Sequence, residues 1–184
     1  PSQEKITEVV ADKFFQENDF FLAFQRKVSL NEDRDTIGLE AFLRLKQTEG
    51  NALPAAALIP VISRMGLLSQ LAEVVLTQTV EHWNELHKKH LDYKIAINVD
   101  VSVFNDTQSL SSLISIIEKA AMPACNLAID IIVDERETVT EQIIHSLNTL
   151  RVMGVGLALE ITSEESVDVE CLNQLPIDEI KFGR

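Results

Sequence analysis

The sequence predicts an α/β fold in which parallel strands, each followed by a helix, curve into a barrel that is incomplete at its carboxyl-terminal end. From residue 93 onward, apolar strand patterns alternate with helical patterns, which is typical of parallel βα units. Each strand has one aliphatic face, whereas its other face carries small residues and then a polar residue. Such a face fits the interior of a barrel with a site at the carboxyl ends of its strands.

Composition is consistent with one domain over residues 1–184. The chain has 184 residues, 46% of them hydrophobic, and a formal net charge of −13, which is enough length for a single core. The acidic balance argues against nucleic acid as a partner, because that binding needs concentrated Lys and Arg. No apolar run approaches the ~20 residues of a membrane span, so no membrane insertion is expected in this segment. Cys125 and Cys171 have no metal-binding spacing and predict free, buried thiols in the reducing cytoplasm.

The first elements are predicted to be a helix and a hairpin. Apolar residues at helical spacing predict an amphipathic helix over residues 3–17, within an amino-terminal segment 1–18 of the same domain. Strand patterns at residues 20–25 and 38–45 flank the polar stretch 29–35. This arrangement predicts a hairpin.

The remaining chain is predicted to begin with two helices. Pro54 suits the first turn of a short helix that ends at Ser63. Ser69 is expected to cap a long helix that ends near Lys89. Strands and helices then alternate, beginning and ending with a strand, at residues 93–101, 109–121, 127–133, 138–152, 155–161, 165–174 and 178–182. No phosphate-binding glycine-rich loop follows any of these strands, which argues against nucleotide-binding doubly wound folds.

The strand over residues 38–45 gives the first indication of a site. Side chains alternate between the two faces of a strand, so Glu40 and Arg44 share the face opposite to the leucines. Burial of an unpaired charge is costly. An acid and a guanidinium on one strand face therefore need water, a charged partner, a metal or a ligand.

The corresponding faces of the later strands carry further polar residues, namely Asn98, Asp130, Glu160 and Lys181. With Glu40 they supply three carboxylates and an amide, an oxygen-ligand set for a hard cation such as Mg²⁺, Mn²⁺ or Ca²⁺. Arg44 and Lys181 are candidate phosphate contacts. A two-metal phosphodiesterase uses such a set to hold phosphate oxygens and to activate water. The residues alone also leave open solvated strand-end side chains or internal salt bridges.

In order and in spacing, the chain resembles the EAL domain family, the barrel of bacterial cyclic di-GMP phosphodiesterases and their inactive relatives. Residues 38–44, GLEAFLR, resemble the signature GxEALxR. The other matching segments are FQ at 24–25 for YQP, IP at 59–60 and GLL at 66–68 for FIPxAExxGLI, INV at 97–99 for VNLS, AIDI at 128–131 for LEITE, LRVMGV at 150–155 for LRxLGV, and LPIDEIK at 175–181 for LPVDxIKID. The resemblance implies a TIM-barrel-like EAL domain with about six of eight strands, because the family's last two βα units are not matched.

The resemblance also identifies departures at the site. The four strand-end oxygen ligands occupy the metal-holding positions of active members, although Asp130 and Glu160 have exchanged side-chain lengths. One methylene moves a carboxylate oxygen by about 1.5 Å, against ligand distances of roughly 2.0–2.6 Å. Ile161 stands at the second aspartate of the family's DDFGTG loop, and Gly183 at the aspartate of KID. Lys181 matches the family lysine.

These departures predict a catalytically inactive, degenerate EAL domain that acts in bacterial signal transduction. The loss of a metal-based role would cost several kcal/mol of transition-state stabilisation. The domain would act as a cyclic di-GMP receptor, through Gln25 and Arg44, or as a protein-interaction module that binds a partner or forms a homodimer. Arg26 and the acidic segment 164–170 change the pocket and favour protein interaction.

Two alternatives concern metal and catalysis. No cofactor is expected, but a residual one-metal site for Mg²⁺ or Mn²⁺ is left open, formed by Glu40, Asn98, Asp130 and Glu160. The alternative function is an active metal-dependent phosphodiesterase that converts cyclic di-GMP to pGpG. That activity requires other residues to replace Ile161 and Gly183.

Overall fold

The structure is a computed structural model, and it describes residues 20–30, 35–46, 52–54, 58–133, 138–161 and 173–182. Several predicted features lie outside these residues: the helix over 3–17 with the segment 1–18, the acidic segment 164–170, most of the helix over 165–174, Cys171 and Gly183.

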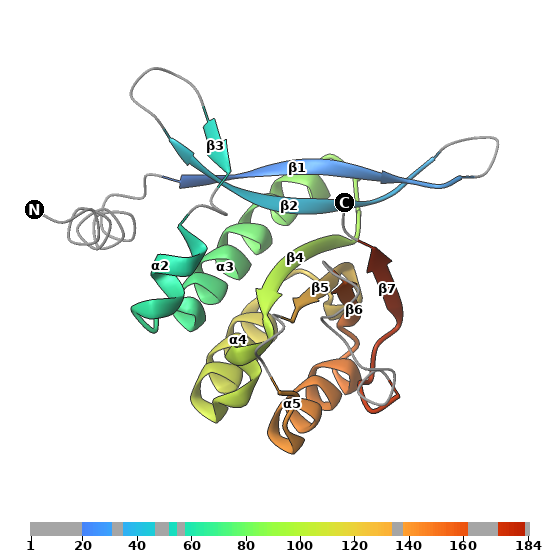
Figure 1. Ribbon diagram of the computed structural model, residues 1–184. Coiled ribbons are helices and arrows are strands. Elements are labelled where there is room, and N and C mark those ends of the chain that lie inside the picture. Colours follow the sequence, from blue (N-terminus) through green and yellow to red (C-terminus); the bar gives the residue numbers. More distant parts are fainter. Residues whose placement is uncertain are drawn as a thin grey trace, which may run out of the picture.

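The predicted hairpin is confirmed. Strands β1, Phe20–Val28, and β2, Thr36–Lys46, pair antiparallel, with an irregularity in the register at Lys27 and Val28. A short strand β3, Ala52–Pro54, pairs antiparallel with the carboxyl end of β2. In Figure 1 the hairpin forms a long, extended arm across one side of the molecule.

The start of the first described helix differs from the prediction. Pro54 is the last residue of β3, and helix α2, Ile59–Arg64, has Pro60 in its first turn instead. Both prolines meet the same local preference for a first helical turn. The pairing of β3 with β2 excludes Pro54 from the helix.

Helix α3, Leu68–His87, also begins without the predicted cap. Its cap position is Leu67, which makes no side-chain capping hydrogen bond. Ser69 lies in the first turn, and its Oγ accepts a hydrogen bond of 2.7 Å from the Oγ of Ser109. The side chain therefore ties α3 to the next helix instead of capping its own.

The parallel part of the sheet follows the predicted alternation. Its strands are β4, Ile95–Asp100, β5, Leu127–Ile132, β6, Gly156–Ile161, and β7, Glu179–Phe182. The strand order is β1-β2-β4-β5-β6-β7, and β2 and β4 to β7 are parallel. Figure 1 shows these strands curving into an open barrel, with α3, α4 (Thr107–Lys119) and α5 (Glu141–Val152) on its outer side.

Side-chain caps fix where the two later helices begin. Asp106 accepts hydrogen bonds from the backbone N–H groups of Gln108 and Ser109 at the start of α4, and Thr140 accepts one from that of Ile143 at the start of α5. These bonds satisfy donors that a helix amino terminus leaves unpaired. Short 3₁₀ turns, η2 (Val101–Asn105) and η3 (Ala124–Asn126), complete the connections.

The two faces of the strands separate as predicted. The aliphatic residues of β4, β5 and β6 are buried against the helices. The opposite face places small residues side by side across the sheet, where Ala96 pairs with Ala128 and Ala128 with Gly156. Cys125 is a free thiol as predicted, but it is exposed in η3 and not buried. A three-residue turn before β5 does not enter the core.

Candidate functional site

Four of the predicted site residues meet on the interior face of the sheet. Glu40 of β2, Asn98 of β4, Asp130 of β5 and Lys181 of β7 form a group that we call the carboxylate–lysine cluster. The Nζ of Lys181 lies 3.2 Å from Glu40 Oε2 and also donates to Asp130 Oδ2. The Nδ2 of Asn98 donates to Glu40 Oε1 over 3.3 Å. One ammonium thus joins carboxylates from two strands.

Strand register explains why these residues meet. Asn98 and Asp130 are direct partners in the β4–β5 ladder, so their side chains point to the same face. Glu40 belongs to β2, which pairs with β4. Lys181 comes from β7, and it reaches Glu40 across 141 residues of sequence. The curvature of the sheet brings β7 toward β2, the first strand of its parallel part.

Burial shapes the electrostatics of the cluster. Asp130 has no exposed side-chain surface, whereas the side chains of Lys181 and Glu40 are 15% and 18% exposed. Burial raises the pKa of the Asp130 carboxyl, and the hydrogen bond from Lys181 only partly offsets this effect. Burial alone would lower the pKa of Lys181, but its bonds and attraction to Asp130 and Glu40 outweigh that and raise it. Lys181 is therefore held in its charged form.

The described residues do not fit a two-metal centre. Among them, no three Asp, Glu, His or Cys side chains lie close enough together to hold a metal ion. Lys181 binds both carboxylates of the cluster, and Ile161 offers no donor atom. Two oxygens, Asn98 Oδ1 and Asp130 Oδ1, are buried without a hydrogen-bond partner. Buried polar atoms are rarely left without a partner. Each of these two oxygens can therefore still accept a hydrogen bond or bind a cation.

A cavity of about 430 Å³ adjoins the cluster at the carboxyl ends of β2 and β4. Its polar lining includes Arg44, Asn98 and Glu160, and residues of α3 supply much of its apolar wall. The Nη1 of Arg44 donates to the backbone oxygen of Leu43 over 3.0 Å, and its guanidinium lies 5.3 Å from the centre of the Phe42 ring. A cation over an aromatic face is attracted by the ring.

Three predicted site residues, Arg44, Glu160 and Gln25, are not members of the cluster. Glu160 lines the cavity, and none of the described hydrogen bonds joins it to the cluster. Gln25 is exposed on β1, where its register partner is Glu40. The structure thus brings Arg44 and Glu160 to one cavity. Glu40, Asp130 and Lys181 form the neighbouring ion cluster.

Three residues near the site were missed as site residues from the sequence. Asp100 lines the same cavity, and its Oδ1 accepts a hydrogen bond of 3.0 Å from the backbone N–H of Ser102. Phe42 lies beneath the Arg44 guanidinium. Lys27 of β1 lowers the pKa of Asp130 by charge attraction, which is a smaller effect than burial. The period-two pattern on β4 and β2 could have indicated Asp100 and Phe42.

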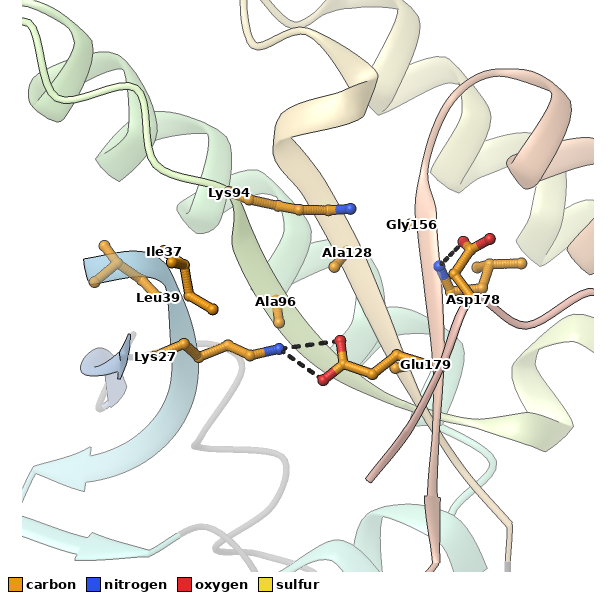
Figure 2. Close-up of a pocket in the computed structure, with 12 residues that line it drawn as sticks. Lys27, Ile37, Leu39, Lys94, Ala96, Ala128, Gly156, Asp178 and Glu179 are labelled. Carbon is orange, nitrogen blue, oxygen red and sulfur yellow. Dashed lines mark hydrogen bonds and ion pairs between the residues drawn. The ribbon is translucent and has the colours of Figure 1, made fainter. Parts of the chain in front are cut away.

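A second cavity, of about 170 Å³, lies at the opposite, amino-terminal ends of the strands. Figure 2 shows its small wall residues, such as Ala96 and Ala128, and the ion pair in which Lys27 Nζ lies 3.3 Å from Glu179 Oε2. The side chain of Lys94 extends across this opening. Sites in barrels of this kind lie at the carboxyl ends of the strands. The larger cavity is therefore the candidate site.

Comparisons with known proteins agree with this geometry. Residues 9–184 match the EAL domain family. The chain is 29% identical over 169 residues to the uncharacterized protein Rv1357c of Mycobacterium tuberculosis, covering 90% of this chain and 54% of that protein. It is 24% identical over 166 residues to MucR of Pseudomonas aeruginosa, a bifunctional diguanylate cyclase/cyclic di-GMP phosphodiesterase, covering 89% of this chain and 24% of MucR. The chain thus spans about half the length of the first of these relatives, and less of the second.

Solved structures show the same fold. The MucR phosphodiesterase in complex with cyclic di-GMP has a TM-score of 0.83 at 21% identity, covering 96% of this chain and 72% of that one. The FimX EAL domain of Pseudomonas aeruginosa bound to cyclic di-GMP has a TM-score of 0.79 at 20% identity, covering 96% and 70%. The predicted barrel is confirmed as the partial form of this fold. No helix in the described part of the chain is long and apolar enough to cross a membrane. The match over residues 9–184 shows that the chain belongs to the EAL domain family, a family of phosphodiesterase-like domains in cyclic di-GMP signalling.

Proposed function

We propose that this chain is a catalytically inactive EAL domain that acts in bacterial signal transduction as a receptor for cyclic di-GMP. The observation that carries the inactivity is the incomplete set of metal ligands at the carboxylate–lysine cluster, because among the described residues no three Asp, Glu, His or Cys side chains lie close enough together to hold a metal ion. Lys181 binds Glu40 and Asp130, the carboxylates that a metal-dependent phosphodiesterase would use to hold metal ions. Ile161 offers no replacement ligand on the neighbouring strand.

The receptor role is supported by the cavity beside Arg44. Its volume of about 430 Å³ falls within the range of small-molecule sites, roughly 300–1,000 Å³. A guanidinium has five N–H donors, and one described hydrogen bond of Arg44, to Leu43, uses Nη1. The remaining donors suit a phosphate group, which arginine binds in a bidentate manner. FimX and MucR, whose EAL domains share this fold, were solved with cyclic di-GMP.

The first prediction concerns nucleotide binding. We expect isothermal titration calorimetry of the chain with cyclic di-GMP, with and without Mg²⁺, to give a micromolar dissociation constant. The carboxylates of Asp100 and Glu160 line the same cavity and oppose tighter binding of an anion. Arg44→Ala is expected to weaken binding by about tenfold, since it removes charge-assisted hydrogen bonds. Arg64→Ala is the matched control, because Arg64 is exposed in the last turn of α2.

A specific observation favours protein interaction as the second candidate function. The end of the hairpin at which the chain passes from β1 to β2 exposes Val28, Leu30 and Ile37, which are 44%, 101% and 60% accessible. Apolar side chains gathered at an exposed site are typical of interaction surfaces. A wild-type chain that binds no cyclic di-GMP would contradict the receptor proposal and leave protein interaction as the remaining function.

The second prediction concerns catalysis. We expect no pGpG after incubation of the chain with cyclic di-GMP and either Mg²⁺ or Mn²⁺, because Ile161 stands where the resemblance places a metal-binding aspartate and the described residues bring no three metal-binding side chains together. Chromatography of the reaction mixture detects the product, and the phosphodiesterase MucR serves as the active control. Turnover that Glu40→Ala abolishes would show that the chain is an active phosphodiesterase.

A further inference from the structure

The second cavity, at the amino-terminal ends of the strands, carries an inference that does not depend on the proposed function. We propose that this cavity is a binding site, without a catalytic role, for a small aliphatic carboxylate. The carboxylate group would bind the ammonium of Lys94, and the carbon chain would lie against the small residues of β4, β5 and β6. The cavity measures about 170 Å³. An apolar cavity of roughly 150 Å³ holds one benzene molecule, so a ligand of about six non-hydrogen atoms fits here.

The strands give this cavity a mainly apolar wall. Ala96 of β4, Ala128 of β5 and Gly156 of β6 lie side by side across the sheet, and all three line the cavity. Ile37 of β2 belongs to the same lining, and Figure 2 shows these residues around one opening. Transfer of an aliphatic chain from water to such surroundings is favourable. The wall therefore suits the hydrocarbon part of a small ligand.

Lys94 supplies the one charge of this lining that has no counter-ion among the described residues. Its side chain extends across the opening in Figure 2, and its Nζ lies so close to Gly156 that a Cβ there would clash with it. None of the hydrogen bonds and ion pairs of the described residues includes this Nζ. An ammonium binds a carboxylate oxygen through a charge-assisted hydrogen bond. A ligand carboxylate would thus meet an available donor at the mouth of the cavity.

The other charged groups of the lining already have partners. The two carboxylate oxygens of Glu179 each lie 3.3 Å from Lys27 Nζ. Asp178 Oδ2 accepts a hydrogen bond of 3.0 Å from the N–H of Leu157, and Asp178 Oδ1 lies 3.1 Å from Nη2 of Arg151. These pairs balance one another, which leaves a single excess positive charge. A monoanion matches that charge, whereas a dianion such as hydrogen phosphate would be repelled by the two nearby carboxylates.

The test titrates small probes into the ¹⁵N-labelled wild-type chain at constant ionic strength and records its amide signals by NMR. Sodium butyrate is expected to give saturable shifts at Ala96, Ala128 and Gly156. Its dissociation constant should be about 1 mM, the weak affinity that so few atoms allow. Butylamine, a cation of similar shape, and inorganic phosphate are expected to give no saturable shifts at these residues.

Three outcomes of this titration would overturn the proposal. One is the absence of saturable shifts with butyrate at about twenty times the expected dissociation constant. Another is equal binding of butylamine, because the ammonium of Lys94 would then not select the ligand. The third is a set of butyrate shifts confined to the cavity beside Arg44.

Variants test the two parts of the site separately. Lys94→Met keeps a side chain of similar length without its charge and is expected to weaken butyrate binding about tenfold. Lys119→Met is the matched control, because Lys119 is exposed in the last turn of α4, and it should bind like wild type. Ala128→Leu fills the cavity and is expected to abolish binding.

Binding that is unchanged in Lys94→Met, or in a folded Ala128→Leu, would contradict the proposal. If Ala128→Leu does not fold, Lys94→Met still decides the matter, because Lys94 is an exposed residue whose replacement leaves the core intact.

Discussion

Lys181→Met is expected to lower the free energy of unfolding by about 3 kcal/mol at neutral pH in EDTA, because it leaves a buried carboxylate without its counter-ion. Asp130 keeps no exposed side-chain surface in the folded chain. The size follows from the usual cost of breaking a buried ion pair, taken at its lower end because Lys181 is 15% exposed. Urea denaturation of both proteins measures the difference.

Two controls define this result. Lys27→Met removes a lysine whose partner Glu179 is 52% exposed, so its loss should cost less than about 1 kcal/mol. The double variant Lys181→Met, Asp130→Asn removes both buried charges and should recover most of the lost stability. A Lys181→Met protein as stable as wild type would mean that the cluster contributes nothing to folding.

The contacts of Lys181 with Asp130 and Glu40 also make the free energy of unfolding depend on pH. The pKa of Lys181 is raised in the folded chain because its contacts with Asp130 and Glu40 outweigh the effect of burial. Its contribution to stability is therefore fully present below about pH 10.4, the pKa of an unfolded lysine, and is lost as the pH rises through the higher folded value. Unfolding measurements in this alkaline range should show that loss in wild type and not in Lys181→Met.

Gly38→Ala is expected to lower the free energy of unfolding by about 2 kcal/mol, because the added methyl group would force the closely packed backbone around it to shift. A Cβ at this position would lie 2.9 Å from the backbone oxygen of Lys94. That oxygen accepts a 2.8 Å hydrogen bond from the N–H of Leu39, so β2 and β4 would have to separate where they first pair. Because Glu40 follows two residues later on β2, the cluster should move as well.

Gly156→Ala is the matched control for this prediction. A Cβ at Gly156 would lie 2.3 Å from Nζ of Lys94, which is the end of a flexible side chain that can turn away. Its cost should be below about 1 kcal/mol, and part of it is offset by the reduced freedom of the unfolded chain. Denaturation curves of both variants check the contrast. Equal losses would mean that the close approach of Lys94 O does not determine the cost at Gly38.

The sequence predicted the strands of the barrel better than the starts of its first helices. Strands β4, β5 and β6 stand out because aliphatic residues recur at every second position, a pattern that burial of one face imposes. Pro54 and Pro60 satisfy the same local rule for a helix start, and only the pairing of β3 with β2 separates them. Likewise, Ser69 had a capping side chain but bonds to Ser109 of α4. Tertiary contacts decided both cases.

The sequence predicted which residues form the site, but not which of them contact one another. Alternation along the strands placed Glu40, Asn98, Asp130 and Lys181 on one face, and the structure brings them together. The bond between Lys181 and Asp130 depends on how strongly the sheet curves, which no local pattern encodes. For the same reason, the alternation along β6 could not predict that Glu160 lies in the cavity wall and outside the cluster.

The long sequence separation within the cluster has a consequence for the order of folding. Lys181 meets Glu40 across 141 residues and Asp130 across 51, whereas the helices and the β1–β2 hairpin form from neighbouring segments. Contacts that close such long loops tend to form late, because the chain must lose the conformational entropy of closing the loop before the contact can stabilise the fold. Changes at Lys181 should then act mainly on the rate of unfolding and leave the rate of folding nearly unchanged. A chain whose cluster is weakened would be short-lived once folded, and not slow to fold.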